Sequence, residues 1–298
     1  ADGTKLAVAY SRDKNGNPGR IYTSTDFGAS WTLTGAPSNV WYYITSSADG
    51  SKLAAVVGGG GIYTSTDFGA NWTLTSAPSN VWYYIASSAD GTKLAAVVYE
   101  DMDGNPGGIY VSTNSGTDWT LTGAPTNHWE TIASSPDGTK LFAAAYAGGI
   151  YASTNSGTDW TLTSAPDLDW ASIAASADGT DLIAAAGSGM AFSADAGATW
   201  SVLPSPDIDL TSVAGSADGT KWIIASSSYG VLTSTDFLGV NWEPAAGLPG
   251  GFFSVASSAD GNRLVAAGGS GIFTWQLPVR HLTALGDDLA VTWTTNQT

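Results

Sequence analysis

Apolar and polar residues alternate in short runs along this chain, and the runs recur in the same order. In residues 40–78, four runs of strand length are separated by turn-forming residues. These runs are Trp41–Ser47, Lys52–Val57, Ile62–Thr66 and Trp72–Ser76. The second run is nearly all apolar, as a strand covered on both faces requires, and the fourth alternates, as a half-exposed strand does. Asp49-Gly50 and the glycines at 58–61 favour tight turns. The pattern therefore predicts a four-stranded antiparallel unit.

This unit repeats along the chain. An Asp-Gly pair precedes the second run, and its Asp stands at positions 2, 49, 90, 137, 178, 218 and 260. The spacings are 47, 41, 47, 41, 40 and 42 residues, which is the length of one four-stranded propeller blade. We therefore predict an all-β chain that forms a seven-bladed β-propeller of four-stranded antiparallel blades, in a single domain over 1–298.

The repeat also sets the blade boundaries. The predicted blades are about 1–36 together with a C-terminal strand at 289–295, then 37–77, 78–124, 125–165, 166–206, 207–248 and 249–288. Because the first blade lacks its own opening run, we expect Leu289–Thr295 to pair within it and to close the ring through the termini. His281–Leu285 then serves as an outer strand. The alternative is that this tail begins a following domain.

A second motif, Ser-x-Asp/Asn-x-Gly-x-x-Trp, lies between the third and fourth runs of most units. Its copies are Ser24–Trp31, Ser65–Trp72, Ser112–Trp119, Ser153–Trp160, Ser193–Trp200 and a looser Ser234–Trp242. The copy Ser193–Trp200 resembles the bacterial neuraminidase repeat, or Asp-box, at every fixed position. The resemblance implies a structural hairpin whose Asp caps the turn and whose Trp packs into the sheet. Asp-box propellers include sialidases and secreted bacterial proteins, so it also implies a bacterial protein that is secreted or displayed on the cell surface.

The charge and composition narrow the classes of partner. The chain has 10 Lys and Arg against 26 Asp and Glu, a net charge of −16, and its basic residues are scattered. A nucleic-acid partner requires clustered basic residues, so we expect none. No apolar run approaches the roughly 18 residues that span a membrane, so we expect no membrane insertion. Cysteine is absent, which excludes thiolate chemistry and disulfides. We expect a monomer.

Large aromatic residues begin the first run of several units. Trp41, Trp82, Trp129, Trp170 and Phe252 occupy equivalent positions. On the predicted top face of a propeller, these rings could stack on a sugar or clasp a peptide. We therefore predict a ligand-binding face lined by these five residues, with a glycan or a protein as the ligand. The alternative is that the rings only plug the wide end of the channel.

Two insertions account for the two longest repeats, and both resemble the start of a calcium loop. They carry Asp13, Asn15 and Asn17 in the first unit and Asp101, Asp103 and Asn105 in the third. Alternating side-chain oxygens of this kind can converge on Ca²⁺. The loops are therefore candidate Ca²⁺ sites. The alternative is a hairpin without metal, because no bidentate Glu follows at the expected distance and an Asn-Pro-Gly hairpin requires no metal.

An enzyme is the alternative to a binding module. A glycosidase needs two placed carboxylates, and the candidates are Glu130 with Asp167 or Asp169, or with the loop acids Asp207 and Asp209. A sialidase-like site needs three arginines, and the four arginines of this chain lie in no recognisable sialidase motif. Moreover, 24–57 and 65–98 differ at only four of 34 positions, and near-copies suit repeated binding or a scaffold. We therefore expect a non-enzymatic recognition module, with a glycoside hydrolase-like enzyme and a structural scaffold as alternatives.

Overall fold

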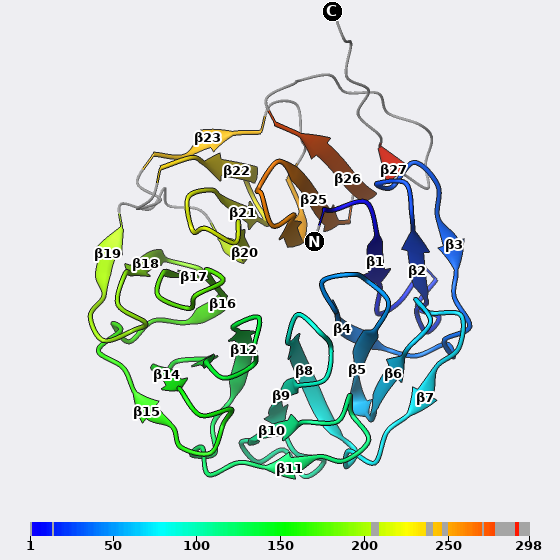
Figure 1. The fold of residues 1–298 in the computed structure, drawn as a ribbon, viewed down its shortest axis with the longest axis horizontal. Helices are drawn as coiled ribbons and strands as arrows, with labels where there is room; N and C mark the ends of the chain where they lie inside the picture. Colours follow the sequence, from blue (N-terminus) through cyan, green and yellow to red (C-terminus); the bar gives the residue numbers. More distant parts are fainter. Residues whose placement is uncertain are drawn as a thin grey trace, which may run out of the picture. The chain divides into compact units, whose positions relative to one another are not determined.

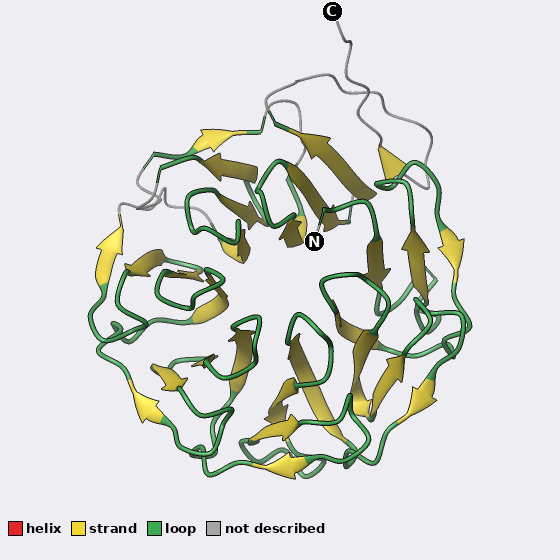
Figure 2. Cartoon of the chain, in the orientation of Figure 1, coloured by secondary structure: helices red, strands yellow, loops and turns green. Residues whose placement is uncertain are grey.

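The computed structural model describes residues 2–13, 15–203, 209–236, 241–245, 250–269, 271–277 and 290–291. Within these ranges the chain forms strands and loops and no helix (Figure 2). Consequently, no helix of the described residues is long and apolar enough to cross a membrane. The chain divides into two compact units. The N-terminal unit comprises Lys5–Ser24 and Trp31–Thr163, and the C-terminal unit comprises Ala1–Thr4, Thr25–Ser30 and Ser164–Thr298.

The N-terminal unit contains strands β1 to β15 (Figure 1). Their bounds are β1 Leu6–Ala9, β2 Ile21–Ser24, β3 Thr32–Leu33, β4 Trp41–Ser46, β5 Leu53–Gly60, β6 Ile62–Ser65, β7 Thr73–Leu74, β8 Asn80–Ser87, β9 Leu94–Glu100, β10 Ile109–Ser112, β11 Thr120–Leu121, β12 Trp129–Ser134, β13 Leu141–Ala145, β14 Ile150–Ser153 and β15 Thr161–Leu162. Neighbouring strands pair antiparallel. β1, β2 and β3 form a three-stranded sheet, β4 to β11 form one eight-stranded sheet, and β12 to β15 form a four-stranded sheet.

The C-terminal unit contains strands β16 to β27. Their bounds are β16 Trp170–Ala175, β17 Leu182–Ala186, β18 Gly189–Ser193, β19 Ser201–Leu203, β20 Leu210–Gly215, β21 Trp222–Ser226, β22 Gly230–Ser234, β23 Glu243–Pro244, β24 Phe252–Ser257, β25 Arg263–Gly268, β26 Gly271–Gln276 and β27 Ala290–Val291. They form three four-stranded sheets in chain order, β16 to β19, β20 to β23 and β24 to β27. The pairs are antiparallel except for β26 with β27, which is parallel.

The apolar second strand of the repeat is buried on both faces in β5, β9, β13, β17 and β21, as its sequence predicts, whereas β1 and β25 are only partly buried. In β5, Ala54 and Val56 pack with Trp82 in one core cluster, whereas Ala55 and Val57 pack with Trp41 in another. Successive residues of a strand point to opposite faces, so this run serves two cores at once. Continuous apolar sequence is therefore required here, and an alternating strand would expose polar side chains to one core.

The repeated Ser-to-Trp motif forms the turn between the third and fourth strands, as the resemblance implied. In the copy between β6 and β7, Asp67 Oδ1 accepts hydrogen bonds from Ser65 Oγ at 2.8 Å and from the Asn71 amide N–H at 2.8 Å. Trp72 Nε1 donates to Gly69 O at 3.1 Å. Phe68 has a φ of 56° and Gly69 a φ of 88°, a left-handed pair that reverses the chain. The motif is thus a turn whose capping side chains come from its own residues, while Phe68 N–H and Gly69 O bond to residues outside it.

Two features of strand pairing differ from the prediction. The glycines at 58–61 do reverse the chain between β5 and β6, with Val57 N–H donating to Gly61 O at 3.1 Å, but Gly58 and Gly60 also pair with Val81 and Asn80 of β8. Small residues allow this close approach of two backbones, which is why two predicted blades share one sheet. At the C-terminus, Ala290–Val291 pairs with β26 rather than with β1. Residues 281–285, 289 and 292–295 lie outside the described residues, so ring closure stays a prediction.

Candidate functional site

The first strand of each complete repeat contains the same β-bulge. In six antiparallel pairs, the register shifts by one residue directly after the position that holds Trp41 in β4. The extra residues at this shift are Tyr42, Tyr83, Glu130, Ala171, Thr211 and Phe253. A bulge leaves one residue outside the ladder and re-aims its side chain. In each repeat, the residue before the bulge is buried in the core, and the next residue lies outside the regular strand pairing.

The predicted ligand-binding aromatics are on the buried side of this bulge. The five side chains have exposed fractions of 0–1%: Trp41, Trp82, Trp129, Trp170 and Phe252. Trp41 packs against Tyr63 and Trp72 of its own sheet, with ring centroids 5.3 Å and 6.2 Å apart. A ring without an exposed face cannot stack on a ligand, so the prediction of a Trp-lined binding face is wrong. The rings are core side chains instead.

The exposed aromatic surface lies one residue further along. Tyr42 and Tyr83 are 44% and 37% exposed, and their rings meet edge to face, 5.5 Å apart at 87°. Tyr83 also approaches Tyr99 of β9, with centroids 5.5 Å apart at 34°. Tyr99 is itself unmatched in the ladder, because Val81 pairs with Glu100 and Trp82 with Val98. Bulges in three strands, β4, β8 and β9, thus bring three tyrosines together.

Glu130 of β12 lies beside this surface, because β12 contacts both β8 and β9. Burial raises the pKa of Glu130 to about 7, and the nearby Tyr83 hydroxyl partly offsets that rise. Burial, and then the charge of Glu130, raise the pKa of Tyr83 to about 12. The pair therefore consists of a phenol that stays protonated and a carboxyl group that titrates near neutral pH.

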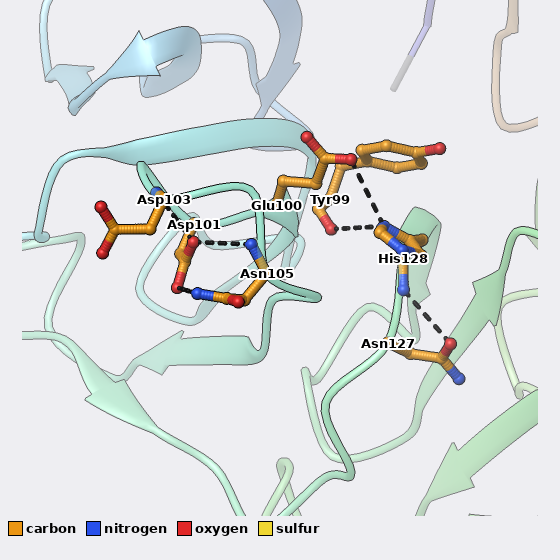
Figure 3. Close-up of polar contacts among 7 residues, drawn as sticks. All are labelled: Tyr99, Glu100, Asp101, Asp103, Asn105, Asn127 and His128. Atoms are coloured by element: carbon orange, nitrogen blue, oxygen red, sulfur yellow. Dashed lines mark hydrogen bonds and ion pairs between the residues drawn. The ribbon is translucent and has the colours of Figure 1, made fainter.

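His128 extends the surface on the other side of Tyr99 (Figure 3). The rings of His128 and Tyr99 lie 4.8 Å apart, and His128 Nδ1 is 3.2 Å from the carbonyl oxygen of Tyr99. The same nitrogen is 3.8 Å from Glu100 Oε1. Six residues therefore form one connected group, which we call the tyrosine–glutamate cluster: Tyr42, Tyr83, Tyr99, Glu100, His128 and Glu130.

The other candidate acids that the structure describes belong to a different compact unit from Glu130. Asp167 and Asp169 are exposed residues of the C-terminal unit, whereas Glu130 belongs to the N-terminal unit. Asp207 lies outside the described residues, and Asp209 is exposed in the C-terminal unit. The pairing of Glu130 with a second catalytic carboxylate thus stays a prediction.

The two loops that resemble calcium sites use their oxygens internally. Asp101 Oδ1 accepts the N–H groups of Asp103 and Asn105 at 2.9 and 2.8 Å, and Asn105 Nδ2 donates to Asp101 Oδ2 at 2.9 Å. These bonds lower the pKa of Asp101. The first-unit loop repeats the arrangement, with Asp13 accepting from Asn15 and Asn17. Because the Asn17 and Asn105 amides turn their N–H groups, not their oxygens, toward the carboxylate, these residues do not fit a cation.

The sequence matches no family model and no curated protein. Solved structures do resemble the chain. YCF48 from Cyanidioschyzon merolae aligns with a TM-score of 0.66 and 14% identity, over 91% of this chain and 95% of that chain. A structure of YCF48 bound to D1 peptide gives 0.58 and 15% identity, over 79% and 77%. A chain of the nidogen/laminin complex gives 0.59 and 13% identity, over 78% and 89%.

These structures are β-propeller proteins, and likeness at such low identity shows the fold alone. The chain is thus an all-β propeller protein built from repeated four-stranded antiparallel sheets. This confirms the predicted fold class at that level, while the number of blades stays a prediction. The tyrosine–glutamate cluster was missed in the sequence except for Glu130. Its signal is the residue that follows each buried Trp, which reads Tyr42, Tyr83 and Glu130 in successive repeats.

Proposed function

We propose that this chain is a non-enzymatic recognition module that binds a segment of another protein through the tyrosine–glutamate cluster. The observation that carries the proposal is the run of ring contacts from Tyr42 through Tyr83 and Tyr99 to His128 on exposed or half-exposed side chains. Tyrosine supplies a large contact area with little side-chain entropy to lose and is enriched where binding energy concentrates. We propose further that the protein is a seven-bladed, ring-closed Asp-box propeller that acts outside a bacterial cell as a monomer.

Two considerations favour a protein ligand over a glycan. First, the Tyr42 and Tyr83 rings are perpendicular, so they do not make the flat platform on which a sugar ring stacks, whereas irregular peptide side chains fit such a corner. Second, two of the similar structures have titles that name a bound peptide or a protein complex: YCF48 bound to D1 peptide and the nidogen/laminin complex. A glycan ligand remains the alternative outcome of the binding test.

The test is a selection of random peptides displayed on phage against the immobilised protein. We expect enriched peptides whose binding is lost in Tyr83→Ala and in Tyr99→Ala. Tyr229→Ala is the matched control, because Tyr229 is 58% exposed but belongs to the C-terminal unit. Enriched peptides that bind all three variants equally would overturn the proposal. A glycan array probed with the same proteins identifies the carbohydrate alternative, by binding that depends on the same two tyrosines.

A glycoside hydrolase-like activity is the second candidate, because Glu130 has a pKa of about 7, suited to a general acid. Its neighbour Tyr83 does not suit a nucleophile, since its pKa is raised to about 12 and an activated nucleophile needs a lowered one. Glu130→Ala would abolish turnover of an aryl glycoside by an enzyme, whereas a binding module shows no turnover to lose. A pure scaffold would bind neither peptide nor glycan at this surface.

A further inference from the structure

The charged groups of the tyrosine–glutamate cluster are unbalanced. Its two carboxylates are Glu100 and Glu130, and its one basic side chain is His128, which faces Glu100 at 3.8 Å. No ion pair joins Glu130 to a basic side chain within the described part of the chain. The nearby Tyr83 hydroxyl favours the ionised form of Glu130 but does not neutralise it. A half-buried carboxylate without a counter-charge costs free energy, which a cationic ligand would offset.

The tyrosine rings beside Glu130 suit the same kind of ligand. Tyr83 lies on β8, which contacts β12 with Glu130, and its ring approaches that of Tyr99 at 5.5 Å. The faces of aromatic rings carry negative electrostatic potential and attract Lys and Arg side chains. Rings and carboxylates at one place therefore act in the same direction, and both disfavour an anion. The net charge of −16 for the whole chain adds a long-range attraction for cationic partners.

The chain provides an internal comparison, because its first repeat contains the same loop as its third repeat, which holds Tyr99 and Glu100. The two loops contain equivalent backbone bridges, so they can be aligned residue by residue. Arg12 pairs with Pro18 as Glu100 pairs with Pro106, and Gly19 pairs with Asn39 as Gly107 pairs with Asn127. In that alignment, the positions of Tyr99, Glu100, His128 and Glu130 hold Ser11, Arg12, Val40 and Tyr42. The first repeat thus forms the same loop with an arginine in place of Glu100 and a tyrosine in place of Glu130. The fold therefore does not require these two acids, and the combination of acidic and aromatic side chains is confined to the tyrosine–glutamate cluster.

We propose that the protein segment bound by this chain presents a lysine or arginine side chain to Glu130, beside the rings of Tyr83 and Tyr99. The inference rests on the proposed function and specifies its ligand. Glu130 is the counter-ion, the two rings provide cation–π contacts, and Glu100 adds negative charge at the rim. Tyr42 belongs to the apolar part of the surface, because its ring contacts Tyr83 and packs over Gly58 of β5.

The test titrates the whole protein with three small probes that differ in charge: Nα-acetyl-lysine methylamide, Nα-acetyl-arginine methylamide and the neutral Nα-acetyl-norleucine methylamide. Tyrosine ring signals are followed by NMR at about pH 8, where Glu130 is ionised. We expect saturable shifts of Tyr83 and Tyr99 with the two cationic probes and much weaker binding of norleucine. Glu130→Gln should weaken binding of the cationic probes roughly tenfold, and higher salt should weaken it further.

Glu243→Gln is the matched control, because Glu243 is an exposed acid of β23 in the C-terminal unit and should leave binding unchanged. Equal binding of norleucine and lysine probes, or equal loss in both variants, would overturn the cationic ligand. Absence of binding by all three probes would overturn it too. The peptide selection distinguishes this failure from a failure of the proposed function, since peptides that depend on Tyr83 but contain no basic residue preserve a binding module.

Discussion

Tyr83 and Glu130 occupy the same bulge position in β8 and β12, two strands that contact each other, and each group shifts the pKa of the other. The two strands belong to neighbouring repeats, so the contact joins equivalent positions of the fold that hold different residues. Because the bulge takes each side chain out of the ladder, repeats with nearly identical backbones can display different chemistry at one position. Successive repeats hold Tyr42, Tyr83 and Glu130 at this position.

The first prediction concerns the pH dependence of stability. The folded state raises the pKa of Glu130 from 4.5 to about 7, so it binds this proton more tightly than the unfolded chain. The resulting stability is fully present below about pH 4.5 and is lost as the pH rises through about 7. Relative to Glu130→Gln, the free energy of unfolding of the wild type should fall by about 1–2 kcal/mol from pH 5 to pH 8, a figure reduced for solvent screening.

Urea denaturation of both proteins at several pH values measures this difference. The other titratable groups of the cluster are Tyr42, Tyr83, Tyr99, Glu100 and His128, and they are common to both proteins, so the difference isolates Glu130. Parallel pH profiles for the wild type and Glu130→Gln would contradict the raised pKa.

The second prediction compares two buried tryptophans. Trp82 and Trp129 are both fully buried at equivalent positions, but Trp82 Nε1 donates to Pro78 O at 3.1 Å whereas Trp129 Nε1 has no partner among the described residues. Both Phe variants leave a similar cavity, but only Trp82→Phe loses a hydrogen bond. Trp82→Phe should therefore cost about 1 kcal/mol more than Trp129→Phe. Equal losses in chemical denaturation would show that the indole N–H of Trp82 contributes nothing net.

The architecture was readable from the sequence because its signals are local and repeated. The apolar run of β5 required burial on both faces, and Ala54 and Ala55 do contact different clusters. The turn copies carried their own capping atoms, as Asp67 shows. The local sequence pattern does not predict the pairing of Gly58 with Val81. That contact depends on how neighbouring repeats approach one another, and a glycine run fits a turn and a close backbone contact equally well.

The candidate site was harder to predict because it depends on a shift of one residue. Alternation alone places Trp41 and Tyr42 on opposite faces but does not say which face is covered. Size suggested that the larger Trp would contact the ligand, whereas its burial at 1% exposure shows that it fills the core. Glu130 stood out as a rare residue type, but its partner Tyr83 lies 47 positions away, and only the assembled sheets bring the two together.

The third prediction concerns calcium. Since Asp101 accepts three hydrogen bonds within its own loop, it stabilises the hairpin without a metal. Asp101→Ala should lower the Tm, whereas Asp103→Ala, which retains the backbone N–H that donates to Asp101, should leave it nearly unchanged. Addition of Ca²⁺ or of a chelator should not shift the Tm of the wild type in differential scanning fluorimetry. A calcium-dependent rise in Tm that is lost in both variants would restore the metal site.

The fourth prediction concerns a pair of positions that exchange residue types between turn copies. In one copy, Asn71 Nδ2 donates to Asp67 Oδ2 at 2.7 Å. In the next, the roles are reversed and Asn114 Nδ2 donates to Asp118 Oδ2 at 2.8 Å. Asn114→Asp should lower the Tm by about 2 °C, because it sets two carboxylates against each other and removes a donor. The double variant Asn114→Asp/Asp118→Asn should recover the loss, whereas additive losses would rule out a direct interaction.

The fifth prediction concerns Asp181, which stands where the other repeats have a basic residue. Lys221 Nζ donates to Asp260 O at 2.8 Å, and its stem lies over Gly261. Asp181 lies over Gly219 in the same way, but it is 93% buried, and burial followed by the charge of Asp178 raises its pKa. Asp181→Lys should replace this unfavourable carboxylate with an amine able to reach the carbonyl of Asp218, and should stabilise the fold by about 1 kcal/mol.

Asp181→Asn separates the two contributions to that gain, because it removes the buried charge without adding a donor that reaches the next turn. We expect its stability to lie between those of the wild type and Asp181→Lys, and the stability of the wild type relative to Asp181→Asn to increase at acid pH as Asp181 takes up a proton. If Asp181→Lys is instead less stable than the wild type in urea denaturation, the carboxylate must make a favourable contact that a lysine cannot replace. The turn at Asp218 would then differ in its requirements from the turn at Asp260, although both have the same backbone hydrogen bonds, from Gly219 to Ser216 and from Gly261 to Ser258.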